Sequence, residues 1–380
     1  MLRKLPIPST SVMPQRDDLV VSQAQGFPFQ LPCGLGRAGT PLELQLNWRR
    51  MLNSFYYLVK PMVPKPFQLY LRRKSVAYQR RIHSDTWPID QRANRPPEGW
   101  RGWPEGRQFC LVLTHDVDQA RGVERSYALA LLEKEQDFRS SFNFVAEGYA
   151  QDSILHQYLS ELGFEIGVHG LVHTGNLFRS SSFFWNQLPK INAYIRDWQA
   201  VGFRAPSMYH DLELIQHMEI EYDASTFDTD PFEPQPDGMG TIYPVWIQAN
   251  SSPRGFVELP YTLPQDFTLF VLMGQKGIDI WRRKLDWIAE CGGMALVNTH
   301  PDYMSFDGQR PSLGEYPAEY YRRFLEYVKS QYGGRYWHVL PKELAKFWRK
   351  RYGNGNNGGG DSPSDRLQAF NNMHLCGTRT

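Results

Sequence analysis

The 380-residue sequence lacks the marks of secreted, membrane-spanning and nucleic-acid-binding proteins. Its four cysteines form no Cys-x-x-Cys pair, which suits a reducing compartment better than a disulfide framework. The longest clean apolar runs, such as 109–113, fall far short of the ~20 residues that a membrane helix needs. Lys and Arg number 42 against 40 Asp and Glu, so no global field favours nucleic acid. We therefore expect a small or neutral partner and no nucleic acid.

The N-terminal part of the chain is irregular. Residues 1–25 mix charges with prolines and lack an apolar h-region, so we expect no secretory signal and a cytoplasmic protein, at most peripheral to a membrane. A basic aromatic arm follows at 48–74, which Pro61, Pro64 and Pro66 are expected to break into two short helices. It either lies on a membrane surface or packs on the domain, and the second is favoured because no single helical face emerges. Residues 78–103 are expected to be a Pro-rich connector.

From Phe109 onward the pattern alternates between strands and helices. Strands are expected at 109–114, 141–146, 165–168, 202–204, 294–298 and 336–340, and helices at 123–138, 153–162, 184–200, 279–290, 317–331 and 341–352. Repeated units of this kind predict an α/β fold, a distorted or incomplete (β/α) barrel of about seven parallel strands with an irregular N-terminal extension. The expected domains are the extension and arm at 1–105, the barrel at 106–350, and a disordered Gly-, Asn- and Ser-rich tail at 351–380.

Two groups of candidate residues follow predicted strands, where a barrel places its chemistry. Asp116 and Asp118 share one side of the first strand, and paired carboxylates of this kind often divide into a cation ligand and a base. His169 and His173 are four residues apart, a metal-chelating spacing that would put both on one face of a helical turn anchored by Leu171 and Val172. Each pattern alone also fits caps, turn residues or structural histidines. Together they favour an open, catalytic metal site.

Two further strand ends carry an arginine and a histidine. Arg204 can hold a neighbouring carboxylate ionised by a bidentate contact, although a surface arginine explains it equally well when it is taken alone. His300 can donate a proton if its pKa lies near neutrality, and a core histidine is the plainer interpretation of a single residue.

These motifs together resemble the polysaccharide deacetylases, carbohydrate esterase family 4. The sequences THDVD, HGLVH, FRAP and LVNTH occur in the family's order, over about 109–344. Upstream, YYLVKPMVPKPFQLYLRR, WPID and GWPEG more loosely resemble the leader of bacterial members from surface-polysaccharide gene clusters. The resemblance implies Asp116 as catalytic base oriented by Arg204, His300 as acid, and a divalent cation on Asp118, His169 and His173. Zinc is the default cation on availability, with cobalt or nickel as alternatives.

The chain departs from the family pattern in three places. Val117 separates the two aspartates, which leaves an exchange of their roles open. Ser207 replaces the usual aromatic residue after Pro206, and its backbone N–H is expected to complete an oxyanion hole, with Trp246 as an aromatic wall. The fourth motif is expected among Asp223, Asp228 and Asp230, because Tyr222–Ser225 resembles its YDSS form.

The resemblance implies a metal-dependent hydrolase that removes N-acetyl groups from amino sugars of a polysaccharide, in bacterial surface-polysaccharide metabolism. Two alternatives remain: a cyclic-amide (allantoin-type) hydrolase on the same barrel, and a catalytically silent glycan-binding protein.

Overall fold

The structure is a computed structural model that describes residues 64–248, 255–306, 308 and 310–353. The chain divides into two compact units, 1–62 and 63–380, and all described residues lie in the second. The predictions made for residues 1–63, including most of the basic aromatic arm, and for 354–380 of the tail lie outside the described residues.

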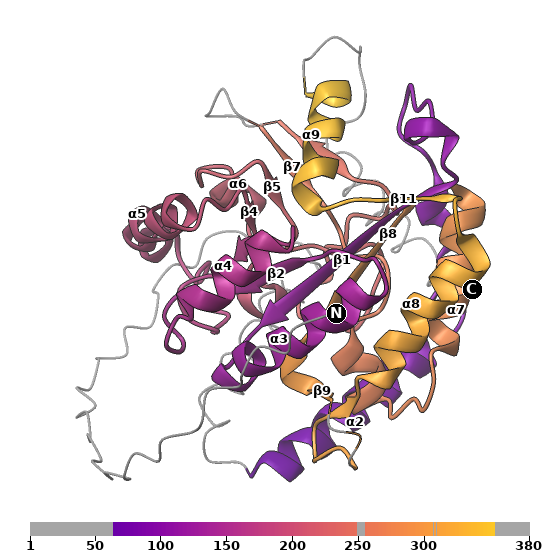
Figure 1. The fold of residues 1–380 in the computed structure, drawn as a ribbon, viewed down its shortest axis with the longest axis horizontal. Coiled ribbons are helices and arrows are strands. Elements are labelled where there is room, and N and C mark those ends of the chain that lie inside the picture. Colours follow the sequence, from indigo (N-terminus) through magenta and orange to yellow (C-terminus); the bar gives the residue numbers. More distant parts are fainter. Residues whose placement is uncertain (1–63, 249–254, 307, 309, 354–380) are drawn as a thin grey trace, which may run out of the picture. The chain divides into compact units, whose positions relative to one another are not determined.

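A curled parallel sheet forms the centre of the described part of the chain (Figure 1). It contains eight parallel strands, namely β1 (Phe109–Val117), β2 (Ser141–Phe144), β3 (Glu165–Val168), β4 (Gly202–Phe203), β5 (Tyr222–Asp223), β7 (Phe256–Glu258), β8 (Met294–Thr299) and β11 (Tyr336–His338). One strand, β6 (Val245–Ile247), runs antiparallel to β7, and β9 (Met304–Ser305) pairs separately with β10 (Tyr316–Pro317).

The sheet curls into an incomplete barrel. The strand β1 is buried throughout and pairs with β2, β8 and β11. At the opposite side no strand pairing joins β7 to β8 among the described residues, but the backbone N–H groups of Thr262 and Leu263 donate to the carbonyl of Leu296 at 3.1 and 3.2 Å. The expected distorted barrel is therefore confirmed.

Helices cover the sheet between successive strands, close to the expected positions. They are α3 (Ala120–Glu135), α4 (Ser153–Glu161), α5 (Ser181–Asp197), α6 (Leu212–Ile215), α7 (Asp279–Cys291), α8 (Glu319–Tyr332) and α9 (Pro341–Tyr352), with a π-helix η5 (Phe267–Leu272) and short 3-10 turns η2 (Gln91–Asn94), η3 (Pro104–Gly106), η4 (Pro206–Met208) and η6 (Pro301–Tyr303). Local signals set several ends: the Asp152 carboxylate caps α4 by accepting from two backbone N–H groups, and Gly292 ends α7 in the left-handed region at φ 73°.

The first described helix, α2 (Lys65–Ile82), is one continuous helix of 18 residues. The helix begins directly after Pro64, and whether another helix precedes it lies outside the described residues. The expectations that Pro66 breaks the arm and that a connector begins at residue 78 are wrong, because the helix continues from Lys65 to Ile82. Pro64 occupies the N-cap and Pro66 lies in the first turn, where the backbone N–H has no intrahelical acceptor and its loss costs nothing.

Residues between α2 and β1 belong to the hydrophobic core. Trp87, Ala93 and Trp103 are buried in the same cluster as β1 and β8. The Trp103 indole donates to the carbonyl of Gly292 at 2.8 Å, and the N–H of Ile242 donates to the carbonyl of Ala93 at 3.1 Å. The division at residue 105 stays a prediction, but residues on both sides of it share one core.

Within the described residues, none of the helices combines the length and hydropathy needed to cross a membrane.

Candidate metal and catalytic site

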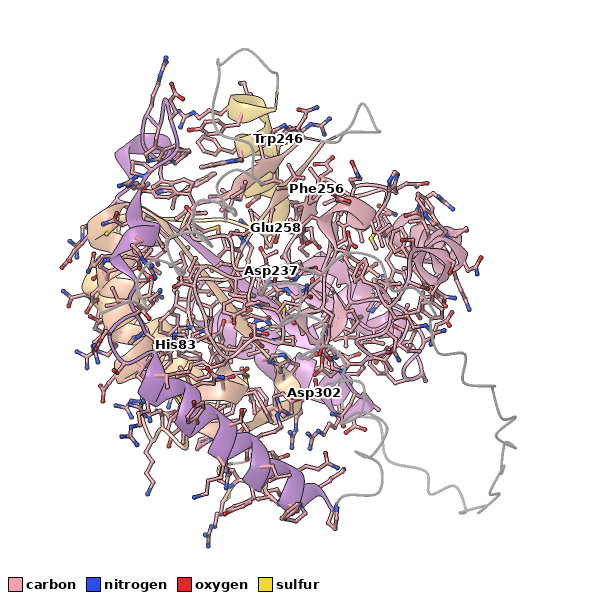
Figure 2. The ribbon with its side chains drawn as sticks, turned by 180° about the vertical axis from the view of Figure 1, so that it is seen from behind. His83, Asp237, Trp246, Phe256, Glu258 and Asp302 are labelled. Carbon is pink, nitrogen blue, oxygen red and sulfur yellow. The ribbon has the colours of Figure 1, made fainter. Side chains whose placement is uncertain are left out.

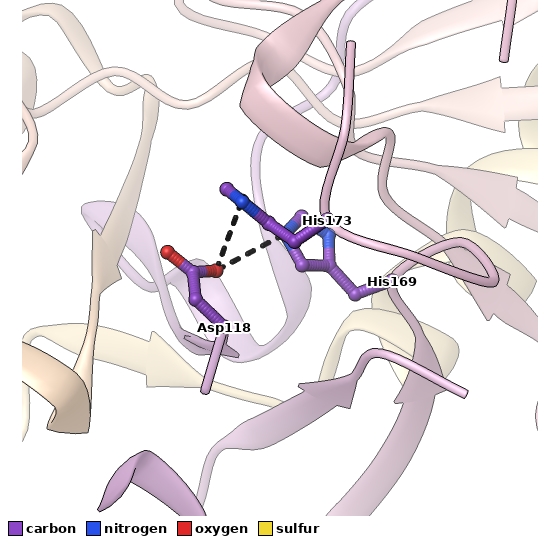
Figure 3. Close-up of side chains that lie close together, drawn as sticks. All are labelled: Asp118, His169 and His173. Carbon is purple, nitrogen blue, oxygen red and sulfur yellow. Dashed lines mark ion pairs between the residues drawn. The ribbon is translucent and has the colours of Figure 1, made fainter. Parts of the chain in front are cut away.

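Three side chains from two strand ends meet at one point (Figure 3). Asp118 follows β1, and His169 and His173 follow β3. The Oδ1 atom of Asp118 lies 3.4 Å from Nε2 of His169 and 3.2 Å from Nε2 of His173. One donor atom from each residue lies within 4.8 Å of the others. The structure therefore brings the expected ligand set together, with Asp118 rather than Asp116 facing the imidazoles.

The two histidines meet without the helical turn expected from their spacing. The segment 169–174 forms bends, and Gly170 has a left-handed φ of 70°. A Cβ atom on Gly170 would lie only 2.7 Å from Cγ of Pro206, so both the backbone and the space require glycine. Leu171 is buried as expected, whereas Val172 is 47% exposed and anchors nothing. Pro206 thus packs on the loop that carries the histidines.

The ligand set fits a divalent cation. The Oδ1 atom of Asp118 is buried and accepts no hydrogen bond from the described residues. Nδ1 of His169 donates to the carbonyl of Arg204 at 2.9 Å, which leaves the Nε2 lone pair of a neutral ring facing that oxygen. Two electron-rich atoms at this distance repel each other unless a metal cation, or a proton on the ring, lies between them; burial opposes the charged ring, but Asp116 and Asp118 raise the pKa of His169. Two imidazoles and one carboxylate leave open positions and suit zinc, cobalt or nickel.

The backbone beside Asp118 is fixed by Asp302. The N–H of Asp118 donates to Oδ2 of Asp302 at 2.9 Å, and the Tyr303 hydroxyl lies 3.4 Å from Oδ2 of Asp118. Burial, with the nearby negative charge of Asp118, raises the pKa of Asp302 to about 7. Gly122 makes room for this contact, because a Cβ atom there would lie 2.3 Å from Oδ2 of Asp302.

Asp116 lies beside this ligand set and is held by three hydrogen-bond donors. Oδ1 accepts from Asn143 at 2.9 Å and from Arg204 at 3.2 Å, and Oδ2 accepts from Asn298 at 2.8 Å, with Nε2 of His300 at 3.9 Å. Burial alone would raise the pKa of Asp116, but the positive charge of Arg204, together with His169, His300 and the Asn143 hydrogen bond, lowers it below its usual value. Asp116 is therefore ionised and fixed in direction.

Arg204 orients Asp116 through one nitrogen rather than the expected bidentate pair. It is fully buried, and Nε donates to the carbonyl of Ala224 at 2.7 Å while NH1 is shared between Asp116 and the Thr114 hydroxyl. The guanidinium thus ties β4 to β1, and its remaining nitrogen NH2 has no acceptor among the described residues.

His300 is held by a residue that the sequence analysis missed. Nδ1 lies 2.7 Å from Oδ1 of Asp266, and Oδ2 of Asp266 accepts from the His300 backbone N–H and from the Tyr316 hydroxyl, each at 2.8 Å. Burial opposes the charged ring, but the Asp266 carboxylate, with Asp118 and Asp116, raises the pKa of His300 to about 10.

The three carboxylates expected for the fourth motif have other partners. Asp223 accepts from the Ser225 hydroxyl at 2.7 Å, Asp228 pairs with Lys284 at 2.6 Å, and Asp230 accepts from the N–H of Phe232 at 3.0 Å. The assignment of the motif to one of them stays a prediction, and Asp266 is the carboxylate that contacts Nδ1 of His300. Asp266 precedes a π-helix rather than a predicted strand, so no periodic pattern marked it.

Ser207 lies where the sequence analysis expected it, beside Pro206, whereas Trp246 lies away from the site. Ser207 lies in η4 directly after Pro206, partly exposed, with a left-handed φ of 57° that is unusual for a residue with a Cβ atom. Trp246 lies on β6 against Gly255 and Gly353, and its indole donates to Gln248 at 3.1 Å. Figure 2 places it well apart from Asp302, the partner of Asp118. The structure does not bring Trp246 to the site, because β6 extends the sheet beyond β7, so its expected role as a wall is wrong.

Comparison with known proteins gives similarity of structure only. No family model matches the sequence, and no curated protein does. Among solved structures, a chain from Mycobacterium smegmatis assigned as a polysaccharide deacetylase is 17% identical with a TM-score of 0.53, over 70% of this chain and 99% of that one. The Puue allantoinase is 15% identical at 0.53, over 70% and 98%, and a chain from Pseudomonas aeruginosa PAO1 assigned as a polysaccharide deacetylase is 16% identical at 0.50, over 70% and 99%. The chain therefore has the fold that these solved polysaccharide deacetylase and allantoinase chains share.

Proposed function

We propose that this protein is a metal-dependent hydrolase that removes N-acetyl groups from amino sugars of a polysaccharide, in bacterial surface-polysaccharide metabolism. The observation that carries the proposal is the meeting of three units at one point: the ligand set Asp118, His169 and His173, the carboxylate Asp116 held by Arg204, and His300 held by Asp266. Each unit alone has structural explanations, but amide hydrolysis by a metal-activated water uses all three kinds: a cation site, a base and an acid.

A bound divalent cation would supply Lewis-acid polarisation of the acetyl carbonyl and acidify the attacking water. Asp116 then acts as the base. The lowered pKa makes Asp116 a weak base, so its reaction depends on the acidification of the water by the cation. The same lowered pKa keeps the Asp116 carboxylate ionised and able to accept a proton. Asn143, Asn298 and Arg204 hold both oxygens in place before substrate arrives.

His300 supplies the second proton transfer. An amide nitrogen leaves poorly as an anion, so the departing amine must be protonated as the C–N bond breaks. With a pKa of about 10, the His300 ring carries that proton at neutral pH, and Nδ1 is fixed on Asp266 so that Nε2 faces Asp116 and the site.

The backbone N–H of Ser207 is the proposed donor to the oxyanion. The left-handed φ of this residue redirects the chain immediately after Pro206, which packs on the histidine loop at Gly170. Preorganised donors of this kind typically change the rate by about 10² to 10³ each.

Acetate release from a panel of N- and O-acetylated oligosaccharides, with zinc, cobalt or nickel supplied, tests the proposal. His169→Ala should lose both bound metal and acetate release. Asp116→Asn should keep the metal and lower kcat by about 10³ or more. His217→Ala, at a partly exposed histidine that contacts Trp185, is the matched control for His169→Ala. Full activity of purified Asp116→Asn would refute the assigned roles.

The alternative of cyclic-amide hydrolysis is favoured only by the similarity to the Puue allantoinase. Small ureides in the same assay separate the two activities, since ring opening would consume allantoin without releasing acetate. Glycan binding by the metal-loaded protein without turnover on either panel would instead indicate a silent binding protein.

A further inference from the structure

The helix α2 has an inner side that packs on the domain. Val76 is its buried residue, and Leu69 packs against the core. On the same side the Arg73 side chain donates from Nε to the carbonyl of Val271 at 3.1 Å, and the guanidinium of Arg72 lies 4.7 Å from the centre of the Phe267 ring. These contacts fix α2 on η5 and determine which side faces outward (Figure 1).

The outward side of α2 is apolar, which is unusual for the free side of a surface helix. It exposes five large side chains, each 44–64% accessible: Phe67, Tyr70, Leu71, Tyr78 and Ile82. Their spacings of three, one, seven and four residues place all of them on one helical face. Within the described residues this is half of the ten large apolar side chains that are this exposed, and the other five are scattered over different elements.

The helix that carries this apolar face is also strongly cationic. The helix contains six cations and no Asp or Glu: Lys65, Arg72, Arg73, Lys74, Arg80 and Arg81. In the sequence, the whole stretch 44–84 contains nine Lys or Arg and no acidic residue, although the protein as a whole is almost neutral. An apolar face on a cationic helix is the pattern of helices that lie in a membrane interface.

We propose that α2 docks the protein on the surface of an anionic lipid bilayer, with Phe67, Tyr70, Leu71, Tyr78 and Ile82 inserted at the level of the head groups. Lys74 and Arg81, exposed on this face, would pair with anionic head groups. The charge argues against the other occupants. A second copy packed face to face would bring Lys74 and Arg81 close to the same cations of its partner. A hydrated acidic glycan would leave the aliphatic Leu71 and Ile82 unmatched.

Flotation of the full chain with vesicles tests this proposal. We expect binding to phosphatidylcholine vesicles that contain about 30% phosphatidylglycerol, and at least tenfold weaker binding to pure phosphatidylcholine. Binding should weaken further when salt is raised from about 0.05 to 0.5 M. The variant Leu71→Ser/Tyr78→Ser/Ile82→Ser should lose at least tenfold in partitioning. Lys74→Gln/Arg81→Gln should lose on the order of 30-fold on anionic vesicles.

The matched control is Ile154→Ser, which removes an apolar side chain that is 73% exposed on α4 and should leave binding unchanged. Thermal unfolding checks that every variant is folded, and the lipid and salt comparisons on the wild type need no variant. Equal binding to neutral and anionic vesicles, or no binding at low salt, would overturn the proposal. So would unchanged binding by both α2 variants, or a concentration-dependent dimer that they abolish.

Discussion

His300 and Asp266 form the closest pair of opposite charges in the site, with Nδ1 and Oδ1 2.7 Å apart across 34 residues of sequence. The same carboxylate accepts from the His300 backbone N–H and from Tyr316, so ring, backbone and neighbouring strand are fixed together. The relationship explains why the pKa of His300 is raised despite burial, and it assigns the proton to the ring at neutral pH.

Asp266→Asn should shift the pH dependence of catalysis. The carboxylate stabilises the charged ring, so its loss should bring the pKa of His300 down from about 10 toward the ordinary value of 6.5. The alkaline limb of the kcat profile should then move to lower pH, with metal content unchanged. Asp279→Asn, at an 87% exposed carboxylate, is the control, and an unmoved alkaline limb in Asp266→Asn would show that His300 is not the acid.

Gly170→Ala should weaken metal binding without touching a ligand. The new Cβ atom would meet Pro206 at 2.7 Å in a left-handed backbone, so the loop must shift and carry His169 or His173 with it. We expect metal affinity to fall by about 10- to 100-fold, measured by competition with a chelating dye. Gly274→Ala also has positive φ but meets no atom within 4 Å, so it controls for backbone strain alone. Equal affinity in the two variants would contradict this account of the loop.

Glu133→Ala should strongly destabilise the fold. Glu133 accepts from Ser140 at 2.6 Å, contacts Nε2 of His115 at 2.9 Å and accepts from Tyr321, and all four side chains are fully buried. Removing it leaves three buried polar groups unpaired, for a loss of about 3 to 5 kcal/mol in the free energy of unfolding. Urea denaturation measures the loss, and Glu124→Ala, an exposed position on the same helix, should change it by less than about 0.5 kcal/mol.

The buried carboxyl of Glu165 should make the free energy of unfolding decrease as pH rises. It is buried on β3, and burial raises the pKa of its carboxyl from 4.5 to about 7, with the Tyr222 hydroxyl and the Lys342 N–H opposing the shift. The folded protein therefore holds a proton that the unfolded chain releases. This group's contribution to stability is complete below pH 4.5 and falls by about 3 kcal/mol as pH rises to about 7.

Glu165→Gln should remove that part of the pH dependence, because the amide cannot titrate and its oxygen still accepts from Lys342. Unfolding free energies at pH 5 and pH 8 test this. The difference between the two pH values should shrink by about 2 to 3 kcal/mol in the variant, and an unchanged difference would mean that Glu165 is ionised in the fold.

The sequence predicted best where local signals are strong. The helix expected at 153–162 ends within one residue of α4, because Asp152 caps it and its apolar residues repeat at helical spacing. The short strands β5 and β7 escaped prediction, since two or three residues carry no measurable alternation. The exposed face of α2 was also missed, because the sequence analysis assigned Tyr78 and Ile82 to a connector, whereas the helix continues to Ile82.

The site was predicted residue by residue only where side chains follow strands. Asp116 lies near the end of β1, Asp118 directly after it, and His169 directly after β3, so the parallel sheet brings them to one edge. Asn143 lies inside β2 and Asp266 before a π-helix, and their contacts depend on packing between distant segments rather than on any local spacing. Trp246 failed for the same reason, since its position follows from a strand direction that the sequence does not specify.

The burial of Trp103 under Gly292 bears on how the protein should be produced. A shortened chain that starts at β1 would lack Trp87 and Trp103 and would expose apolar surface beside α7 and β8. Such a fragment is expected to collect in inclusion bodies, whereas a start upstream of α2 should give soluble material.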